Sequence, residues 1–386
     1  MHFVYGLARQ LRRIIKISVL GCLLSISGLA AAQVLQFPQG EFPLTDYKKS
    51  SVTIDEILTG GPPRDGIPAI DAPVFVDANS AAAWLQDQEP VIALVVNEVA
   101  RAYPLQILMY HEIVNDVIAG VPVAVTFCPL CNASIVFERE VVQGAGKTLL
   151  DFGTTGRLRK SDLLMYDRQT ESWWQQFTGR GVIGEFVDTE LVRRSSQIIS
   201  FGEFRAAFPE AQILSRETGF SRPYGNNPYR GYDAIDNNPF LFRGDIDPRL
   251  PAMERVLSIR SDSETQLIAL GQLVDIPLAH LDIDERSIVV FAASVASSAL
   301  DAGKISESRT VPSAAAYLAK VGDENLTFKL TDGAIVDEQT GSLWNAFGRS
   351  TQGKLSGVQL EQLDDGVHFA FAWLAFDPEA KVIKLE

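Results

Sequence analysis

Cysteine and histidine are scarce in this chain, whose 386 residues include three cysteines and four histidines. Three cysteines are too few for a disulfide framework, and a hydrophobic content of 46% supplies enough apolar material to fold without one. Lys and Arg number 34 against 48 Asp and Glu, which gives a formal net charge of −14. Because phosphate binding needs clustered basic side chains and no basic run follows residue 32, we expect no nucleic-acid partner.

A hydrophobic run long enough to cross a membrane is also absent. The run "ISVLGCLLSISGLAAA" is interrupted by Ser and Gly and falls short of about 20 apolar residues. Basic residues within 9–16 precede it, and Ala30 and Ala32 stand where a signal peptidase reads. We predict a signal peptide over 1–32 and a periplasmic or secreted protein with no integral membrane segment after cleavage. The alternative is a lipoprotein anchored at Cys22, in "VLGC".

Short runs of β-branched and aromatic residues dominate the next part of the chain. Residues 33–74 are rich in Pro, Gly and polar residues and predict an extended arm with one short helical turn. The runs that follow, separated by Gly, Asn and Asp, are "VIALVV", "ARAYPL", "VPVAVTF", "SIVFERE", "KTLLDFG" and "LLMYDR". They predict a predominantly β (α+β) fold, an antiparallel β meander or barrel-like domain with few short helices. The clearest helix lies near "SFGEFRAAFPEA", where Ser200 caps and Pro209 ends it.

The second half of the chain repeats the first in eroded form. "YDRQTESWWQQF" at 166–177 aligns with "VDEQTGSLWNAF" at 336–347, with six identities in twelve ungapped positions. Flanking segments follow in the same order, as "FPEAQIL" and "DPEAKVI" do. About 350 residues after the leader also exceed a typical single core. We therefore predict one domain over 75–250 and a degenerate second copy over 251–386.

The second copy lacks the cysteines. Aligning "AVTFCPLCNAS" with "IVVFAASVASS" places Ala292 and Val295 opposite Cys128 and Cys131, on what we expect to be a similar turn. Cys128 and Cys131 are the only thiols that remain after the leader. Folding alone therefore does not require them, which favours a chemical role for the first copy.

The first copy resembles a family of exported proteins known as domain-of-unknown-function 3179. The residues that carry the likeness are "YHEIVNDVIAGVPVAVTFCPLCNAS", "DFGTTGRLRKSDLLMYDRQTESWWQQFTGRGVIG", "ILSRETG" and "YGNNPYRGYD", within roughly 75–245. The resemblance implies that His111, Cys128, Cys131 and the segment "SDLLMYDR" belong to a recurring pattern. It implies no activity.

Metal binding is the first chemistry that this pattern fits. Two thiolates three residues apart can take adjacent positions around a metal ion, and Pro129 pre-sets the turn between them. If "ILMYHEIV" and "VAVTF" are neighbouring strands, His111 reaches Cys128 and Cys131. This soft set suits copper before zinc. Further candidates for a ligand or pocket are Met109, Met165, Arg157, Lys160, Ser161 and Asp162.

Other chemistries stay open beside metal binding. C-x-x-C also fits a thiol-disulfide oxidoreductase acting on a partner protein, or an inert disulfide in a non-catalytic interaction scaffold. Asn132 stands where a c-type haem motif requires histidine, and "FGTTG" lacks the spacing of a nucleotide-binding loop, so neither cofactor is expected. No hydrolase motif occurs, and catalytic residues remain unassigned. The expected partner is an exported protein or a metal donor or acceptor.

Overall fold

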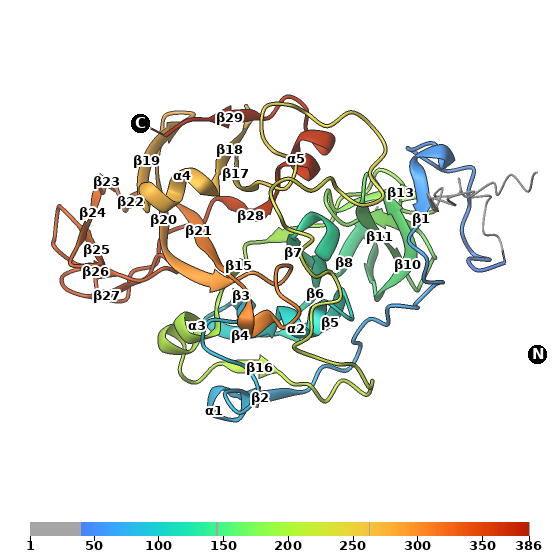
Figure 1. Cartoon of the computed structure of the whole chain (residues 1–386), viewed down its shortest axis with the longest axis horizontal. Coiled ribbons are helices and arrows are strands. Elements are labelled where there is room, and N and C mark those ends of the chain that lie inside the picture. The colour runs from blue at the N-terminus through green and yellow to red at the C-terminus, as the bar shows by residue number, and fades with distance from the viewer. Residues whose placement is uncertain (1–39, 144–145, 262, 386) are drawn as a thin grey trace, which may run out of the picture. The chain divides into compact units, whose positions relative to one another are not determined.

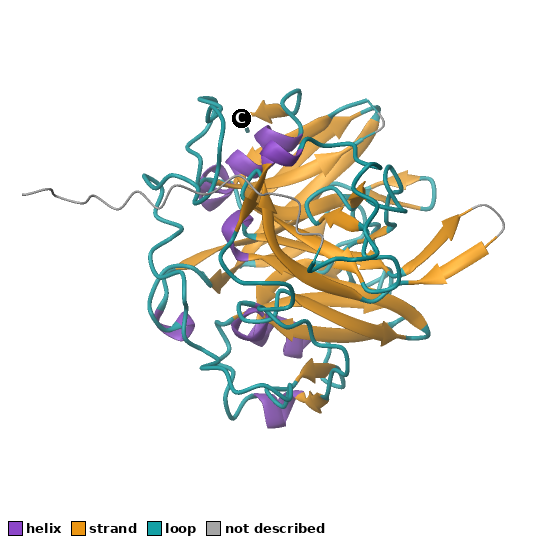
Figure 2. Ribbon diagram, turned by 90° about the vertical axis from the view of Figure 1, so that its right-hand side faces the viewer, coloured by secondary structure: helices purple, strands orange, loops and turns teal. Residues whose placement is uncertain are grey.

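The computed structural model describes residues 40–143, 146–261 and 263–385, and they lie in one compact unit within Gln33–Glu386. The predicted signal peptide over 1–32, the alternative predicted anchor at Cys22 and the start of the predicted arm fall outside the described residues. Strands make up most of the fold and the helices are short (Figure 2). The prediction of a predominantly β protein is confirmed.

Three sheets and one hairpin build the first half (Figure 1). One sheet has the order β15 (Gln197–Ser200), β3 (Pro90–Val96), β4 (Val99–Pro104), β16 (Gln212–Leu214), β2 (Phe75–Asp77). The next has the order β14 (Arg193–Arg194), β7 (Ala133–Glu138), β6 (Val121–Cys128), β5 (Ile113–Ile118). The third has the order β1 (Ile57–Thr59), β10 (Phe152–Arg159), β11 (Asp162–Asp167), β12 (Trp173–Gln175), β13 (Arg180–Ile183). The hairpin pairs β8 (Glu140–Gln143) with β9 (Gly146–Leu149).

The second half is built from three sheets and a small hairpin (Figure 1). The sheets have the orders β28 (Asp364–Phe369), β17 (Arg255–Arg260), β18 (Thr265–Ala269), β29 (Lys381–Ile383); β19 (Leu278–Ile283), β20 (Arg286–Ser297), β21 (Thr310–Leu318); and β24 (Phe328–Thr331), β25 (Ala334–Asp337), β26 (Leu343–Trp344), β27 (Ser350–Gln352). The hairpin pairs β22 (Lys320–Val321) with β23 (Glu324–Asn325). Every sheet in the described part of the chain is open, so the barrel-like alternative does not apply.

Corresponding sheets of the two halves share a pairing pattern. β4 pairs antiparallel with β3 and parallel with β16, and β18 pairs antiparallel with β17 and parallel with β29. The aligned motifs also share a hydrogen-bond network. The indole of Trp174 donates to Asp167 at 2.9 Å, and that of Trp344 donates to Asp337 at 3.0 Å. These parallels are what duplication expects, and the duplication itself stays a prediction.

One expected parallel fails at the cysteines. In the first half β6 ends at Cys128, and the chain turns at once into a 3₁₀ helix. In the second half β20 runs on past Ala292 and Val295, with a shift of its register against β21 between Phe291 and Ser294. The expected turn at Ala292 to Val295 is therefore wrong, because a bulged strand replaces it. Pro129, which favours the turn in the first half, has no counterpart there.

The helices are few and cap the ends of strands. They are α1 (Ala78–Ala81), α2 (Leu105–Leu108), α3 (Phe201–Ala207), α4 (Leu270–Asp275) and α5 (Ala370–Phe376), with 3₁₀ helices η1 (Ile54–Glu56), η2 (Pro129–Cys131) and η3 (Ile305–Glu307). The predicted helix after Ser200 is α3, whose Glu203 backbone N–H donates to the Ser200 hydroxyl. Within the described residues, no helix is long and apolar enough to cross a membrane.

The largest hydrophobic cluster contains residues of both halves. It includes Cys128 and Cys131 from the first half and Phe369 and Trp373 from the second. Phe177 links them directly, because its ring lies 5.1 Å from that of Trp373. The two predicted copies therefore share a core, and the cysteines lie within it.

Candidate metal centre

The two cysteines occupy one sharp turn at the end of the β6–β7 hairpin. Cys128 is the last residue of β6 and pairs with Ala133 of β7, and η2 places Cys131 in the loop between them. Asn132 closes the turn in the left-handed region, with φ of 48°. Both cysteines are free thiols, and they are 2% and 0% exposed. The turn thus holds two side chains of soft donor chemistry inside the core.

Asp162 is the third member of the group. A carboxylate oxygen of Asp162 and the sulfur atoms of Cys128 and Cys131 all lie within 4.8 Å of one another. Asp162 begins β11 after a two-residue turn, in which Lys160 and Ser161 have φ of 54° and 66°. Positive φ at both positions is the geometry of a type I′ hairpin turn. The hairpin therefore brings Asp162 to thiols that are about thirty residues earlier in the sequence.

The carboxylate of Asp162 is held on one side only. Its Oδ2 accepts hydrogen bonds from Gln175 Nε2 at 2.6 Å and from the Phe177 backbone N–H at 2.8 Å. Its Oδ1 is buried and accepts no hydrogen bond from a described N–H or O–H group, while the thiols of Cys128 and Cys131 interact with the carboxylate and favour its charged form. Burial raises the pKa of Asp162 to about 7. A buried carboxylate oxygen without a donor is costly unless it is protonated or meets a cation.

Burial also dominates the acidity of the neighbouring groups. It raises the pKa of the Cys128 thiol, and it raises the pKa of Cys131 well above the usual value. Burial, followed by the charge of Asp162, raises the pKa of Glu112 to about 8. Glu112, Cys128, Cys131 and Asp162 thus lie buried together. Their pKa values are set mainly by burial, by hydrogen bonds and by the charges of the other members of this group. No basic side chain is among these influences, so a bound cation would allow them to ionise.

His111 lies apart from this group. It falls in the turn between α2 and β5, not on the strand expected for "ILMYHEIV", because α2 begins directly after Pro104 and Glu112 takes a φ of 59°. Both ring nitrogens are already engaged. Nδ1 donates to the Pro68 carbonyl at 2.7 Å, and Nε2 accepts from the Tyr224 hydroxyl at 2.6 Å. The predicted set of Cys128, Cys131 and His111 is therefore not assembled, and Asp162 takes the third position.

The methionines and the basic candidates have other partners. Met109 and Met165 are buried in the hydrophobic cluster that holds the cysteines. Arg157 pairs with the carboxylate of Glu41 and donates to the carbonyl of Thr155. Lys160 donates to the Ala375 carbonyl at 2.6 Å, which ties the turn to α5.

Ser161 contributes its backbone to the site. Its carbonyl oxygen lies 3.9 Å from the sulfur of Cys128 and 3.6 Å from that of Cys131. Its hydroxyl points elsewhere and donates to the carbonyl of Phe240. A carbonyl at these distances is a weak acceptor for the thiols.

A small cavity adjoins the group. It has a volume of about 110 Å³, and its walls are mostly apolar. Glu112 and Arg157 are its charged members, and Leu130 and Leu163, which neighbour Cys131 and Asp162 in sequence, form part of its wall. Glu112 was not among the predicted site residues, and the sequence signal that marks it is an acidic residue immediately before the apolar strand β5.

The fold and the site define a mainly β protein with a buried dithiol and carboxylate. The chain matches the family described as "Protein of unknown function (DUF3179)" over residues 64–380, and it belongs to that family. The match extends beyond the expected 75–245 and includes most of the second half. No curated protein and no solved structure matches the chain.

Proposed function

We propose that this protein binds one zinc ion through Cys128, Cys131 and Asp162. The observation that carries the proposal is the buried group itself, in which two thiols and a carboxylate lie within 4.8 Å of one another and the Oδ1 of Asp162 accepts no N–H or O–H donor from a described residue. Two thiolates and a carboxylate are zinc ligands, and a site with three protein ligands keeps a fourth position for water or a bound molecule. Glu112, which lines the adjoining cavity, supplies a second carboxyl group close by.

Zinc takes precedence over copper because of the third ligand. The sequence predicted a soft set completed by His111, which favoured copper. In the structure a carboxylate replaces the imidazole, and both nitrogens of His111 are engaged by Pro68 and Tyr224. Carboxylate oxygen is a hard donor that suits zinc better than copper(I), while thiolates suit both. Copper remains the competing metal in the test.

A thiol-disulfide enzyme acting on a partner protein is less well supported. Such enzymes need an accessible thiolate with a lowered pKa. Cys128 and Cys131 are buried, and burial raises the pKa of both thiols. The proposal retains the exported location that the leader predicts, where an exported metal donor or acceptor would be the partner.

Metal content tests the proposal directly. The full chain is expressed with export, purified under reducing conditions, and assayed by mass spectrometry for zinc and copper per folded chain. We expect about one zinc in the wild type, almost none in Cys128→Ser/Cys131→Ser, and a strong decrease in Asp162→Asn. Asp167→Asn is the matched control, because Asp167 is an equally buried carboxylate of the same strand with Trp174 and Thr170 as partners.

Two results would overturn the proposal. One is a wild-type protein that takes up no metal even after incubation with zinc under reducing conditions. The other is full zinc content in Cys128→Ser/Cys131→Ser, which would locate the metal elsewhere. Copper in place of zinc at the same residues would keep the site and change the metal.

A further inference from the structure

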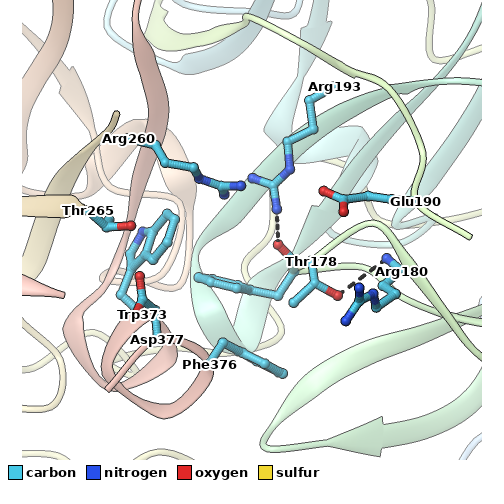
Figure 3. Close-up of a pocket in the computed structure, with 10 residues that line it drawn as sticks. Thr178, Arg180, Glu190, Arg193, Arg260, Thr265, Trp373, Phe376 and Asp377 are labelled. Atoms are coloured by element: carbon cyan, nitrogen blue, oxygen red, sulfur yellow. Dashed lines mark hydrogen bonds between the residues drawn. The ribbon is translucent and has the colours of Figure 1, made fainter. Parts of the chain in front are cut away.

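A second cavity lies where the two halves meet (Figure 3). It has a volume of about 350 Å³, within the range of small-molecule sites. Its lining comes from the ends of β12, β13, β14, β17 and β18 and from α5: Phe177, Thr178, Arg180, Glu190, Arg193, Arg260, Thr265, Trp373, Phe376 and Asp377. The cavity is separate from the proposed zinc ligands, although Phe177 touches both.

Guanidinium groups give this cavity unused hydrogen-bond donors. Arg193 and Arg260 point toward one another in Figure 3 and share the carboxylate of Asp365 at 3.3 and 3.0 Å. Arg193 also donates to the carbonyl of Phe177, and its Nε is fully buried, so its guanidinium contributes positive charge to the cavity rather than an accessible donor. Arg260 pairs with Asp365 through its Nε, and its terminal nitrogens donate no hydrogen bond to a described residue. The side chain of Arg180 forms no ion pair with a described residue. Donors of this kind recognise carboxylate or phosphate oxygens.

Aromatic rings form the opposite wall. The ring of Phe177 lies 5.1 Å from Trp373 in an edge-to-face arrangement and 4.9 Å from Phe376 in a stacked one. The guanidinium of Arg260 lies 5.8 Å from the ring of Trp373. A flat ring can pack against such a wall, while a charged group attached to it reaches the arginines. The cavity thus has an apolar side and a polar side, on which three arginines outnumber the two lining carboxylates, Glu190 and Asp377.

We propose that this cavity binds a small organic acid, a carboxylate attached to a flat aromatic ring. The carboxylate accepts hydrogen bonds from the terminal nitrogens of Arg260, and the ring packs against Trp373 and Phe376. Inorganic phosphate has no ring, so it would contact the arginines but not the aromatic wall. An uncharged aromatic amide leaves the guanidinium donors without a charged acceptor. The preference for a ring that carries a negative charge follows from the two sides together.

Binding of benzoate, phenylacetate and indole-3-acetate to the full chain tests this proposal. Titration calorimetry and intrinsic tryptophan fluorescence measure the dissociation constant, with benzamide as the uncharged probe and inorganic phosphate as the probe without a ring. We expect at least one aromatic acid to bind, and benzamide and phosphate to bind at least about tenfold more weakly. Arg260→Gln should weaken binding of the acid about tenfold or more.

Arg349→Gln is the matched control. Arg349 is 39% exposed against 42% for Arg260, and each forms an ion pair with a carboxylate. We expect the control to bind the acid as the wild type does. Binding by none of the acids at millimolar concentration, equal binding of benzamide, or equal loss in both arginine variants would each overturn the proposal. Cys128→Ser/Cys131→Ser should retain acid binding, so this result and the zinc result stand or fall separately.

Discussion

The backbone N–H of Phe177 donates a hydrogen bond of 2.8 Å to the carboxylate of Asp162. One residue thus fixes the proposed zinc ligand through its backbone and forms a wall of the second cavity through its ring. Gln175 holds the same carboxylate oxygen. Both hydrogen bonds go to Oδ2, so the proposed zinc site leaves Oδ1 as the oxygen that would bind the metal ion.

Replacing Asp162 with Asn should separate metal binding from folding. The Asn amide has the shape of the protonated carboxyl group, and its carbonyl can still accept from Gln175 and Phe177. We expect zinc affinity to fall about tenfold to a hundredfold or more, while the melting temperature of the metal-free protein changes little. Chelator competition and thermal unfolding measure the two effects. A large loss of stability without zinc would make Asp162 a structural residue instead.

Zinc affinity should rise steeply with pH. Burial raises the pKa of Cys128, Cys131 and Asp162, so these groups hold protons near neutral pH that a metal ion must displace. Each proton released makes the apparent affinity about tenfold higher per pH unit. Chelator competition between pH 6 and 8 should therefore show an increase of more than tenfold per unit. A flat profile would mean that the ligands are already ionised without metal.

His368 should make the protein less stable in mild acid. Burial, followed by the charges of Arg193 and Arg260, lowers the pKa of His368 from 6.5 to about 3. Because the folded pKa lies below the unfolded one, the folded state binds fewer protons between these values. The neutral His368 side chain therefore contributes fully to the free energy of unfolding above pH 6.5, and this contribution is lost progressively as the pH falls toward 3.

The variant His368→Gln tests this contribution. Between pH 7.5 and 5, His368 should account for a loss of about 2 kcal/mol in the free energy of unfolding. The variant should lose less over that range, as measured by urea unfolding of metal-free protein. The indole of Trp373, which donates to His368 at 3.0 Å, provides a fluorescence readout of the same region. Identical pH slopes in variant and wild type would exclude the histidine as the cause.

The aligned aspartates of the two halves should stabilise their sheets in the same way. Asp167 and Asp337 each accept a tryptophan N–H and a threonine backbone N–H. Removing the charge with Asn should cost about 1 to 3 kcal/mol in either half, because buried donors lose a charged acceptor. Denaturant unfolding measures the cost, and the exposed turn residue Asp332 provides the control Asp332→Asn. A cost in only one half would argue against equivalent roles.

Short-range patterns predicted the strands well. The runs from "VIALVV" to "LLMYDR" coincide with strands between β3 and β11, and Ser200 caps α3 as expected. These features depend on alternation and on local hydrogen bonding, which the sequence carries directly. The turn at Cys128 to Cys131 was also predictable, because Pro129 restricts the backbone there.

The composition of the site was harder to predict. His111 seemed to lie on a strand, but α2 interrupts the apolar run and moves it to a turn. Asp162 was one of six secondary candidates, and nothing local distinguishes it. Its position depends on how the β10–β11 hairpin packs against the β6–β7 hairpin, which is a long-range relationship. A single sequence does not specify such packing, because several registers satisfy the same alternation.

The hydrophobic cluster shared by the halves determines how this protein can be divided. Phe369 and Trp373 lie in the same cluster as the thiols, and Lys160 beside the site bonds to the carbonyl of Ala375. A fragment that stops near residue 250 would expose this apolar surface and lose the anchor of the Lys160 turn. The cysteine-bearing half is therefore not a minimal unit for biochemistry or crystallisation.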